Sequence, residues 1–385
     1  MKLDLCTAGN ELADLHSSVQ RVLDQHAAFG LRRQVAASAP GWSPLVWREL
    51  VNLGVAGLCA PEDCGGFQRS AADWGDVQRL LGRALSLEPA MATYLCTTAL
   101  RLQAPAEHRQ RLLEPVLQGR SLMAWAHDEP AARHAALWVE CAAHQDAQGQ
   151  WRLSGCKTNV LHGAAAQTFI VSARLAGAPA AADGVALFLL SADGAGVGRD
   201  ALRLVDDTPA ARLTLESAAA QPLAPDAMGL GGAAVLGVRR AGAAAACADM
   251  VGAMELAYDL TLEHVRTRRQ FGRPLADNQA VRHTVADMVV HLEAATSMAM
   301  LAAAAVDDPD RTHPADLSRA KLVVSRSARA LTHAAIQLHG GLGMSEEHAV
   351  GHCLRRVIVG DQLFGDASAH ASALGARLAE EAAHA

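Results

Sequence analysis

The first segment that could carry chemistry is a basic run at the end of a predicted helix, RTRRQFGRPLADNQAVRHTVADM, at residues 266–288. Three arginines, with Arg268 in the middle, precede a Gly-x-Pro break. Guanidinium groups in this place could clamp a diphosphate by bidentate hydrogen bonds, and Phe271 could offer its ring to an adenine. A basic helix end that complements the helix dipole would use the same residue types. The residues alone leave these two interpretations open.

The second segment is AIQLHGGLGMSEEHAV, at residues 335–350, where a helix that carries Gln337 runs into a glycine-rich turn. At Gly340 and Gly341 a backbone without Cβ atoms could approach a phosphate or a ribityl chain closely. Many helices also end on glycine, so this pattern is weak evidence by itself. His339 could do acid–base chemistry, but we expect a capping or core histidine.

The elements that position these segments follow the order helical, β, helical. Helical periodicity covers residues 44–54, 71–85, 90–100 and 107–117. Short alternating runs follow between residues 137 and 225, at 151–154, 168–174, 184–190 and 211–215. A hairpin tip is expected at 148–150. These runs predict an antiparallel β sandwich or barrel. Long helices return at 235–264, 276–306, 314–339 and 346–359.

Composition excludes several classes of protein. The 385 residues are 51% hydrophobic, which is enough for a large core of two or three domains. A net charge of −6 with scattered basic residues gives no footprint for nucleic acid. The eight cysteines form no C-x-x-C pair, so neither a metal site nor a disulfide framework is expected. The longest apolar runs are too short to span a membrane and no signal peptide is recognisable, so we expect a cytoplasmic protein.

The two segments together resemble the signature of the acyl-CoA dehydrogenase family. The first supplies Arg-x-Gln-Phe-Gly-x-Pro at 268–274, and the second supplies Gln-Leu-His-Gly-Gly-x-Gly at 337–343. Pro-Glu-x-x-Gly-Gly at 61–66 and Gly-Arg-Ala-Leu-x-Leu-Glu-Pro at 82–89 are also similar to the family. The resemblance covers the whole chain. Leu-Phe-Gly-Asp at 363–366 with His370 is most similar to small subunits of the pimeloyl-CoA dehydrogenase type.

The resemblance implies an α+β fold with an N-terminal helical domain at 1–121, a middle antiparallel β domain at 122–227 and a C-terminal four-helix bundle at 228–385. It also implies FAD at a subunit interface. The diphosphate and adenine end would be reached by Arg268, Gln270, Phe271, Leu275, Asn278 and Gln279. The diphosphate of a cofactor bound mainly by a neighbouring subunit would face Gln337, Leu338, Gly340 and Gly341.

The family's flavin-ring contacts fall on Trp125-Ala-His-Asp-Glu-Pro130, where this sequence departs from the usual pattern. Asp128 stands where the family commonly has threonine, and the Trp-Ile-Thr element after the strand lysine becomes Asn-Val-Leu at 159–161. The resemblance therefore implies FAD binding with altered contacts to the ring, Trp125 and Asp128 among them.

The most informative departure is the missing catalytic base. The family reaction removes an α proton from an acyl thioester, which requires a positioned carboxylate. The two places where the family keeps its glutamate fall on Gly365 and Gly242. Asp366 is the nearest replacement, although its position before an Ala-Ser-Ala run is also that of a residue capping the next helix.

Three hypotheses follow. The chain could be a working acyl-CoA dehydrogenase with Asp366 as its base, in a homo-oligomer that passes electrons to an electron-transfer flavoprotein or a similar acceptor. It could be a non-catalytic or half-site subunit of a hetero-oligomer with a second family member. It could also be a flavin monooxygenase or oxidase of the same fold.

Overall fold

The computed structural model describes residues 10–384. The chain forms two compact units that interleave along the sequence. Unit 1 takes in the described residues of Met1–Arg32, Ala71–Ser86 and Ala243–Ala385, and unit 2 comprises Arg33–Ser70 and Leu87–Gly242. Two helices, α2 (Phe29–Ala36) and α7 (Gly231–Thr267), run from one unit into the other.

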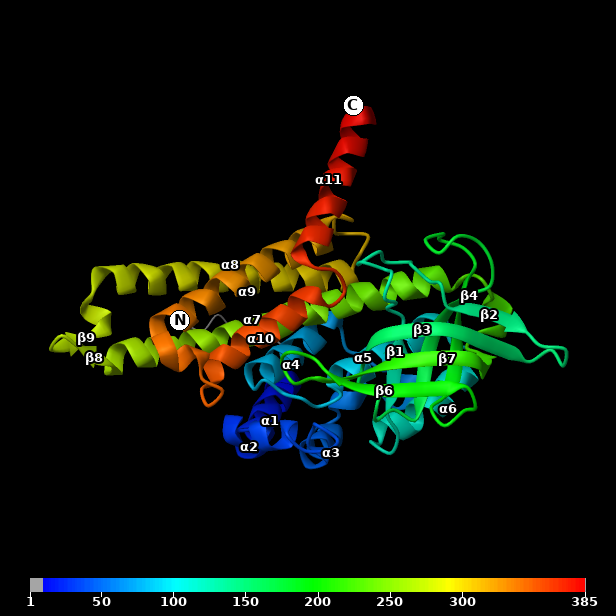
Figure 1. Ribbon diagram of the computed structural model, residues 1–385, viewed down its shortest axis with the longest axis horizontal. Helices are drawn as coiled ribbons and strands as arrows, with labels where there is room; N and C mark the ends of the chain where they lie inside the picture. The colour runs from blue at the N-terminus through cyan, green and yellow to red at the C-terminus, as the bar shows by residue number, and fades with distance from the viewer. Residues whose placement is uncertain (1–9, 385) are drawn as a thin grey trace. The chain divides into compact units, whose positions relative to one another are not determined.

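Unit 1 is built from helices. Figure 1 shows α7, α8, α9 and α10 running side by side, and these four helices share one apolar core. The bounds of the unit 1 helices other than α7 are α1 Asn10–His26, α4 Ala71–Arg83, α8 Gln279–Asp307, α9 Asp316–His339, α10 Ala349–Gln362 and α11 Ala367–His384. The core is made largely of alanine, methionine and valine, with Met250, Met254 and Ala257 fully buried.

Small residues let two helices of unit 1 approach backbone to backbone. A Cβ atom on Gly82 of α4 would collide with the carbonyl oxygen of Asp249 on α7, and one on Gly252 of α7 would collide with that of Arg79. Asp249 also accepts hydrogen bonds from Arg356 of α10 at 2.7 and 2.9 Å. The alanine- and glycine-rich composition thus serves close helix packing.

Unit 2 joins a few helices to a seven-stranded sheet. Its helices are α3 Pro44–Asn52, α5 Ala90–Gln103 and α6 Ala106–Leu117. Its strands are β1 Met123–Ala126, β2 Ala142–Gln145, β3 Trp151–Leu161, β4 Thr168–Arg174, β5 Val185–Ser191, β6 Val197–Arg203 and β7 Pro209–Pro222. The strand order β1-β4-β2-β3-β7-β5, with β6 on β7 and a further pairing of β4 with β5, closes the sheet on itself like a barrel.

The expected β region is confirmed in position and in its main antiparallel pairings. Strand β4 begins and ends where its periodicity predicted, and the turn at 148–150 joins β2 to β3. The first strand departs from the prediction, because β1 pairs in parallel with β4 through Met123–Thr168 to Ala126–Val171. β1 is buried on both faces, so it lacks the alternation that marks a half-buried antiparallel strand.

The predicted helices at 44–54, 71–85, 90–100 and 107–117 are confirmed as α3 to α6. The helices α1 and α2 were not predicted. The three-domain division remains a prediction, since the two compact units follow packing and the three domains follow the type of secondary structure.

One helix, α8, is long and apolar enough to cross a membrane by length and composition alone, with a mean hydropathy of 1.6 over its most apolar 18 residues. The sequence-based exclusion considered only unbroken apolar runs, whereas α8 reaches this value with polar residues among its apolar ones. A single such helix is weak evidence, because core helices of soluble proteins pass the same test.

Candidate functional site

The two motif segments meet at one end of unit 1. His264, near the end of α7, stacks on His339 at the end of α9 with ring centroids 4.4 Å apart. His339 in turn lies 4.8 Å from the ring of His348, which caps α10. Figure 1 shows the small hairpin β8–β9 and the turn after α9 at this same end of the helices. Burial is the main cause that lowers the pKa of His264 and of His348, which favours neutral imidazoles in this stack.

The first motif segment folds into the hairpin of β8 (Arg269–Gln270) and β9 (Arg273–Pro274). Its turn residues, Phe271 and Gly272, have φ of 51° and 81°, the left-handed pair that a two-residue hairpin turn requires. Phe271 is fully exposed, and the side chains of Arg268 and Gln270 are exposed beside it. A cation, an amide and an aromatic ring on a fixed turn are suited to a nucleotide.

Internal hydrogen bonds fasten this hairpin to the start of α8. The Leu275 amide donates to the Arg268 carbonyl at 2.9 Å, and the Arg273 guanidinium donates to Asn278 Oδ1 at 2.6 Å. The Asn278 amide group donates to the Leu275 carbonyl at 3.1 Å. Asn278, expected to contact the cofactor, thus stabilises the turn itself, while Gln279 is exposed at the first position of α8.

The second motif segment ends α9 and begins the short helix η5 (Gly340–Met344). Gln337 is exposed and Leu338 is half-buried. Gly340 has a φ of 61°, but Gly341 does not have a positive φ, and a Cβ atom on Gly341 would meet nothing within 4 Å. Packing within this chain does not explain a glycine at 341, which is what a site for close approach by another molecule would look like.

His339 is a core histidine, as expected. It is buried, and its Nδ1 lies 2.8 Å from the carbonyl oxygen of Ala335, one turn earlier in α9. Because a carbonyl can only accept, Nδ1 carries the proton. His339 therefore supports the helix end on which the glycines lie.

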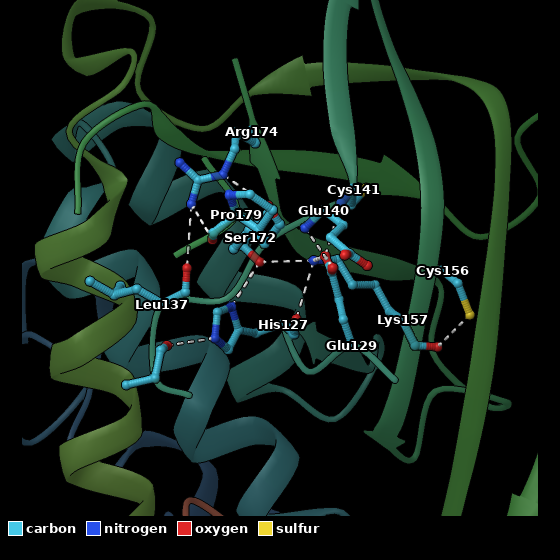
Figure 2. Close-up of polar contacts among 12 residues, drawn as sticks. His127, Glu129, Leu137, Glu140, Cys141, Cys156, Lys157, Ser172, Arg174 and Pro179 are labelled. Carbon is cyan, nitrogen blue, oxygen red and sulfur yellow. Dashed lines mark hydrogen bonds and ion pairs between the residues drawn. The ribbon is translucent and has the colours of Figure 1, made fainter. Parts of the chain in front are cut away.

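In unit 2, the residues that follow β1, 127–130, form what we call the β1 loop, and a buried charged network holds it (Figure 2). Lys157 of β3 has no exposed surface and uses all three protons of its ammonium group. It donates to Glu129 Oε1 at 2.6 Å, to Ser172 Oγ at 3.1 Å and to the His127 carbonyl at 3.2 Å. Glu129 also accepts the backbone amides of Glu140 and Cys141 at 2.6 and 3.0 Å.

The direction of the hydrogen bonds around His127 follows from its partners. Nε2 lies 3.0 Å from the Ala136 carbonyl, which can only accept, so Nε2 carries the proton. Nδ1, 2.8 Å from Ser172 Oγ, therefore accepts the hydroxyl proton. Burial, with the charges of Lys157 and Arg239 adding to it, lowers the pKa of His127 well below its ordinary value. A charged lysine, a serine and a neutral histidine thus form one directed chain.

Asp128 lies between these two buried anchors but is itself partly exposed. Its carboxylate pairs with the Arg239 guanidinium of α7 at 3.3 Å, and its carbonyl accepts the Thr158 amide at 2.8 Å. The Arg239 side chain is 10% exposed and also donates to the His134 carbonyl at 3.4 Å. Trp125 is buried and stacks on His127, so the Asp128 carboxylate is the ionic group that this loop leaves partly exposed.

A second cation, Arg174 of β4, ties the segments beside the β1 loop (Figure 2). Its buried guanidinium donates to main-chain carbonyls that include those of Val139 at 2.8 Å, Pro179 at 2.7 Å and Asp183 at 2.9 Å. These bonds hold the chain before β2 and before β5 in place, so Arg174 has a structural role.

In unit 1, the turn between α10 and α11, residues 363–366, contains Gly365, one of the two positions at which the resemblance predicts the family's glutamate. Lys321 of α9 is fully buried and donates to the carbonyls of Asp361 and Gly365 at 2.9 and 3.0 Å. Gly365 has a φ of 103°, and a Cβ atom there would lie 2.9 Å from His370 Nε2. The turn is therefore shaped for glycine.

Asp366 is used as a helix cap. Its Oδ1 accepts the Ala369 amide at 2.7 Å, the standard bond of an N-cap residue to the third residue of its helix, α11. The interpretation of Asp366 as a cap is confirmed by this bond, and its role as a base stays a prediction. The second expected base position, Gly242, is buried within α7.

Sequence reasoning missed how the β1 loop is organised: Lys157 appeared only as the lysine of a strand and Glu129 only as part of 125–130, and their pairing was not predicted. A signal existed, because the sequence contains only three lysines and Lys157 lies inside a predicted strand region. Across residues 10–384, no group of three or more His, Cys, Asp or Glu side chains could hold a metal ion.

Comparison with known proteins gives a consistent result. Residues 10–120 match the family model of the acyl-CoA dehydrogenase N-terminal domain, and residues 229–379 match that of the C-terminal domain. Acyl-CoA dehydrogenase IpdE2 of Mycobacterium tuberculosis is 27% identical over 344 residues, which cover 89% of each chain. The L-prolyl peptidyl-carrier-protein dehydrogenase of Pseudomonas fluorescens is 29% identical over 343 residues, which cover 84% of this chain and 86% of that protein.

Solved structures share the fold over nearly the whole chain. A glycine-to-alanine variant of the steroid ACAD Tcur3481-Tcur3483 is 28% identical, with a TM-score of 0.86 and coverage of 97% of this chain and 99% of that one. The ChsE4-ChsE5 complex from Mycobacterium tuberculosis has a TM-score of 0.86 at 23% identity and covers 98% of this chain and 99% of its own. Each of these names joins two designations.

Proposed function

The chain belongs to the acyl-CoA dehydrogenase family, and we propose that it is the FAD-binding half of a hetero-oligomeric enzyme that introduces an α,β double bond into an acyl-CoA. FAD, the cofactor of the family, supplies the acceptor for the β hydride. The single observation that carries the proposal is a contrast at two sites. The end of unit 1 that holds the β8–β9 hairpin and the turn after α9, which we call the nucleotide end, is exposed and carries groups that can bind a nucleotide. The expected base position carries no side chain.

The nucleotide end fits FAD by the chemistry of its donors. Arg268 and Gln270 can donate hydrogen bonds to phosphate oxygens, and the Phe271 ring can stack on an adenine. Gly341 leaves open space at the end of α9, where a diphosphate could approach the backbone. Because Phe271 is fully exposed, a cofactor held here would contact a surface that this chain does not cover by itself. That supports a site completed by a second subunit.

The outer face of α8 supports assembly as well. Val290 and Met300 are 66% and 47% exposed, and the exposed positions 286, 290, 293, 297, 300 and 304 on this face include only one charged residue. Four of these six positions are apolar, and two large apolar side chains exposed on one helix face are typical of an interaction surface. We therefore attribute the apolar character of α8 to subunit packing, in keeping with a cytoplasmic oligomer.

The base is the part that this chain lacks. Gly365 and Gly242 cannot take a proton, and the Asp366 carboxylate is bound to the amide of Ala369. We propose that the carboxylate that removes the α proton belongs to a second family subunit. The names of the related two-component structures support this assignment. An electron-transfer flavoprotein or a similar acceptor would then reoxidise the cofactor.

Co-expression tests the proposal. The chain is purified alone and together with a family member encoded beside it, and the visible flavin spectrum is recorded for both. We expect the pair to be yellow and to bleach anaerobically with an acyl-CoA, and the single chain not to bleach. Bleaching by the single chain would overturn the half-site assignment in favour of a self-sufficient dehydrogenase. Oxygen consumption with a reduced flavin donor, without bleaching, would indicate a monooxygenase or an oxidase instead.

A further inference from the structure

Lys157 is an unusual residue in this chain. The sequence contains three lysines, and two of them, Lys157 and Lys321, are fully buried. Lysine is almost never fully buried unless it is paired, because removing an ammonium group from water is costly. Lys157 meets this cost with three acceptors, one of them the buried carboxylate of Glu129. The ammonium group of Lys157 must therefore lie within hydrogen-bond distance of all three acceptors at once.

Those three acceptors all lie on, or bind to, one short stretch of chain. Two belong to the β1 loop, the His127 carbonyl and the Glu129 carboxylate. The third, Ser172 Oγ, donates in turn to His127 Nδ1. Lys157 thus holds His127 by its main chain directly and by its ring through Ser172 (Figure 2). The β1 loop cannot shift without breaking a charged hydrogen bond.

The side chain between the two anchors points elsewhere. His127 and Glu129 are buried, while Asp128 between them is partly exposed and meets Arg239. The neighbour of Lys157 on β3, Thr158, donates its amide to the Asp128 carbonyl at 2.8 Å. Strand β3 therefore fixes three consecutive residues of the loop, and the orientation of Asp128 follows from that of its neighbours.

We propose that Lys157 is a positioning residue for the flavin ring, acting through the β1 loop. The inference rests on the proposed function and on the flavin-ring contacts that the family resemblance implies at 125–130, with Asp128 among them. Lys157 touches neither the cofactor nor the substrate in this arrangement. It sets where the loop presents its backbone groups and the Asp128 carboxylate, and so tunes the environment of the ring while leaving the adenine end unaffected.

The test compares four forms of the full chain, purified with its partner subunit if the chain requires it for flavin binding. These are the wild type, Lys157→Met, Ser172→Ala and Lys321→Met. Lys321→Met is the matched control, because it removes the other buried ammonium, which lies in unit 1. Ser172→Ala is the milder variant, because it removes the link to the His127 ring and leaves the Lys157–Glu129 pair in place.

Affinity for FAD and for ADP is measured by calorimetry, and the visible spectrum and midpoint potential of bound flavin are recorded. For Lys157→Met we expect FAD to bind about tenfold more weakly, as for the loss of a charged hydrogen bond, with ADP affinity unchanged. The flavin spectrum and potential should shift in Lys157→Met, shift less in Ser172→Ala and stay as in the wild type in Lys321→Met.

The outcomes separate the two levels of inference. If wild-type protein binds neither FAD nor ADP, alone or with a partner, the proposed function fails. If wild-type protein binds both but the spectrum and potential are unchanged in Lys157→Met and Ser172→Ala, the positioning role is wrong while the proposed function stands. Equal losses of FAD and ADP affinity would reduce Lys157 to a general stabilising residue. Should Lys157→Met fail to fold, an unshifted potential in Ser172→Ala would be enough to reject the proposal.

Discussion

Within residues 10–384, each unit contains one fully buried lysine beneath a turn, and the two turns differ in the side chains that they present. In unit 2, Lys157 fixes the β1 loop, which leaves the partly exposed carboxylate of Asp128 beside Arg239. In unit 1, Lys321 fixes the α10–α11 turn, in which residue 365 is a glycine and Asp366 caps the next helix. The comparison shows that holding a turn in place and supplying it with a reactive side chain depend on different residues. A buried lysine can fix a turn in which a central position, here Gly365, carries no side chain.

The carboxylates near the two lysines should differ most in the stability that their loss costs, because Glu129 binds the Lys157 ammonium by its carboxylate, whereas Asp361 binds Lys321 by its main-chain carbonyl. Glu129→Ala leaves the buried Lys157 ammonium without its charged partner and leaves the amides of Glu140 and Cys141 without an acceptor. We expect the free energy of unfolding of unit 2 to fall by about 3–5 kcal/mol. Asp361→Ala, near Lys321, removes an acceptor of the Ala367 amide at 3.0 Å, and we expect a loss of about 1–3 kcal/mol in unit 1.

Urea unfolding measures this difference by two probes. Tryptophan fluorescence reports mainly on unit 2, because Trp74 is the only one of the six tryptophans that lies in unit 1. The helical circular dichroism signal reports mainly on unit 1, because most of the helical residues lie in that unit. A loss for Glu129→Ala no larger than that for Asp361→Ala would contradict the view that the Glu129 carboxylate contributes more to stability than the Asp361 carboxylate does.

Restoring a glutamate at 365 should fail for structural reasons. Gly365 has a φ of 103°, and a Cβ atom there would lie 2.9 Å from Nε2 of His370, whose Nδ1 lies 3.1 Å from Ser318 Oγ. We expect Gly365→Glu to destabilise unit 1 by about 2–3 kcal/mol, the cost of a strained backbone plus crowding, and not to create a dehydrogenase active alone.

Gly341→Ala is the matched control, since its new methyl group meets nothing within 4 Å. Its stability should stay within about 0.5 kcal/mol of the wild type, while its affinity for FAD falls. Thermal unfolding and flavin titration check both variants. A fully stable Gly365→Glu protein whose flavin is bleached by acyl-CoA without a partner subunit would contradict the claim that the α10–α11 turn cannot carry a base.

These contrasts also mark what the sequence could predict. The cap at Asp366 was predictable because a cap and its helix are neighbours in the chain, and strand β4 was predictable because its apolar run lies between clear turn residues. The ion pair between Lys157 and Glu129 was not predictable, because the partners are 28 positions apart in the sequence and no periodic pattern connects them. The parallel pairing of β1 was hidden for the same reason, since only the partner strand defines its direction.

The glycine at 365 was predictable only in part. The sequence shows a glycine at 365, where the resemblance implies a glutamate, but the reason that the position suits glycine is a φ angle and the nearby His370, which only the fold supplies. Motif residues therefore indicate what chemistry is present, and the buried contacts beneath them determine whether it can be changed.

Asp366 provides a smaller effect that separates a cap from a base. Asparagine caps a helix as well as aspartate does, but it cannot take a proton. We expect Asp366→Asn to keep wild-type stability and the wild-type rate of flavin bleaching by acyl-CoA in the assembled enzyme. Asp366→Ala should lose about 1 kcal/mol of stability and little of that rate. Loss of bleaching in Asp366→Asn at full stability would show that unit 1 does supply a base from this turn.

The smallest expected effect concerns pH and must be known before unit 1 and unit 2 are compared at different pH values. Burial, with Asp73 adding to it and Arg79 opposing it, raises the pKa of Asp76 in α4 from 3.8 to about 6. The folded state therefore holds this proton more tightly than the unfolded state does. Ionising Asp76 opposes folding, so unit 1 loses stability as pH rises from about 4 through about 6.

Asp76→Asn removes this dependence, because an amide does not ionise. We expect the variant to gain about 1 kcal/mol over the wild type at pH 7, allowing for solvent screening of a partly exposed group, and to match it near pH 3.5. Urea unfolding followed by circular dichroism across this range measures the difference. Because Asp76 lies in unit 1, the tryptophan signal of unit 2 should show no such gain. A gain that appears equally in both signals would mean that the two units unfold as one, and the two anchors would then have to be compared by flavin binding instead of by stability.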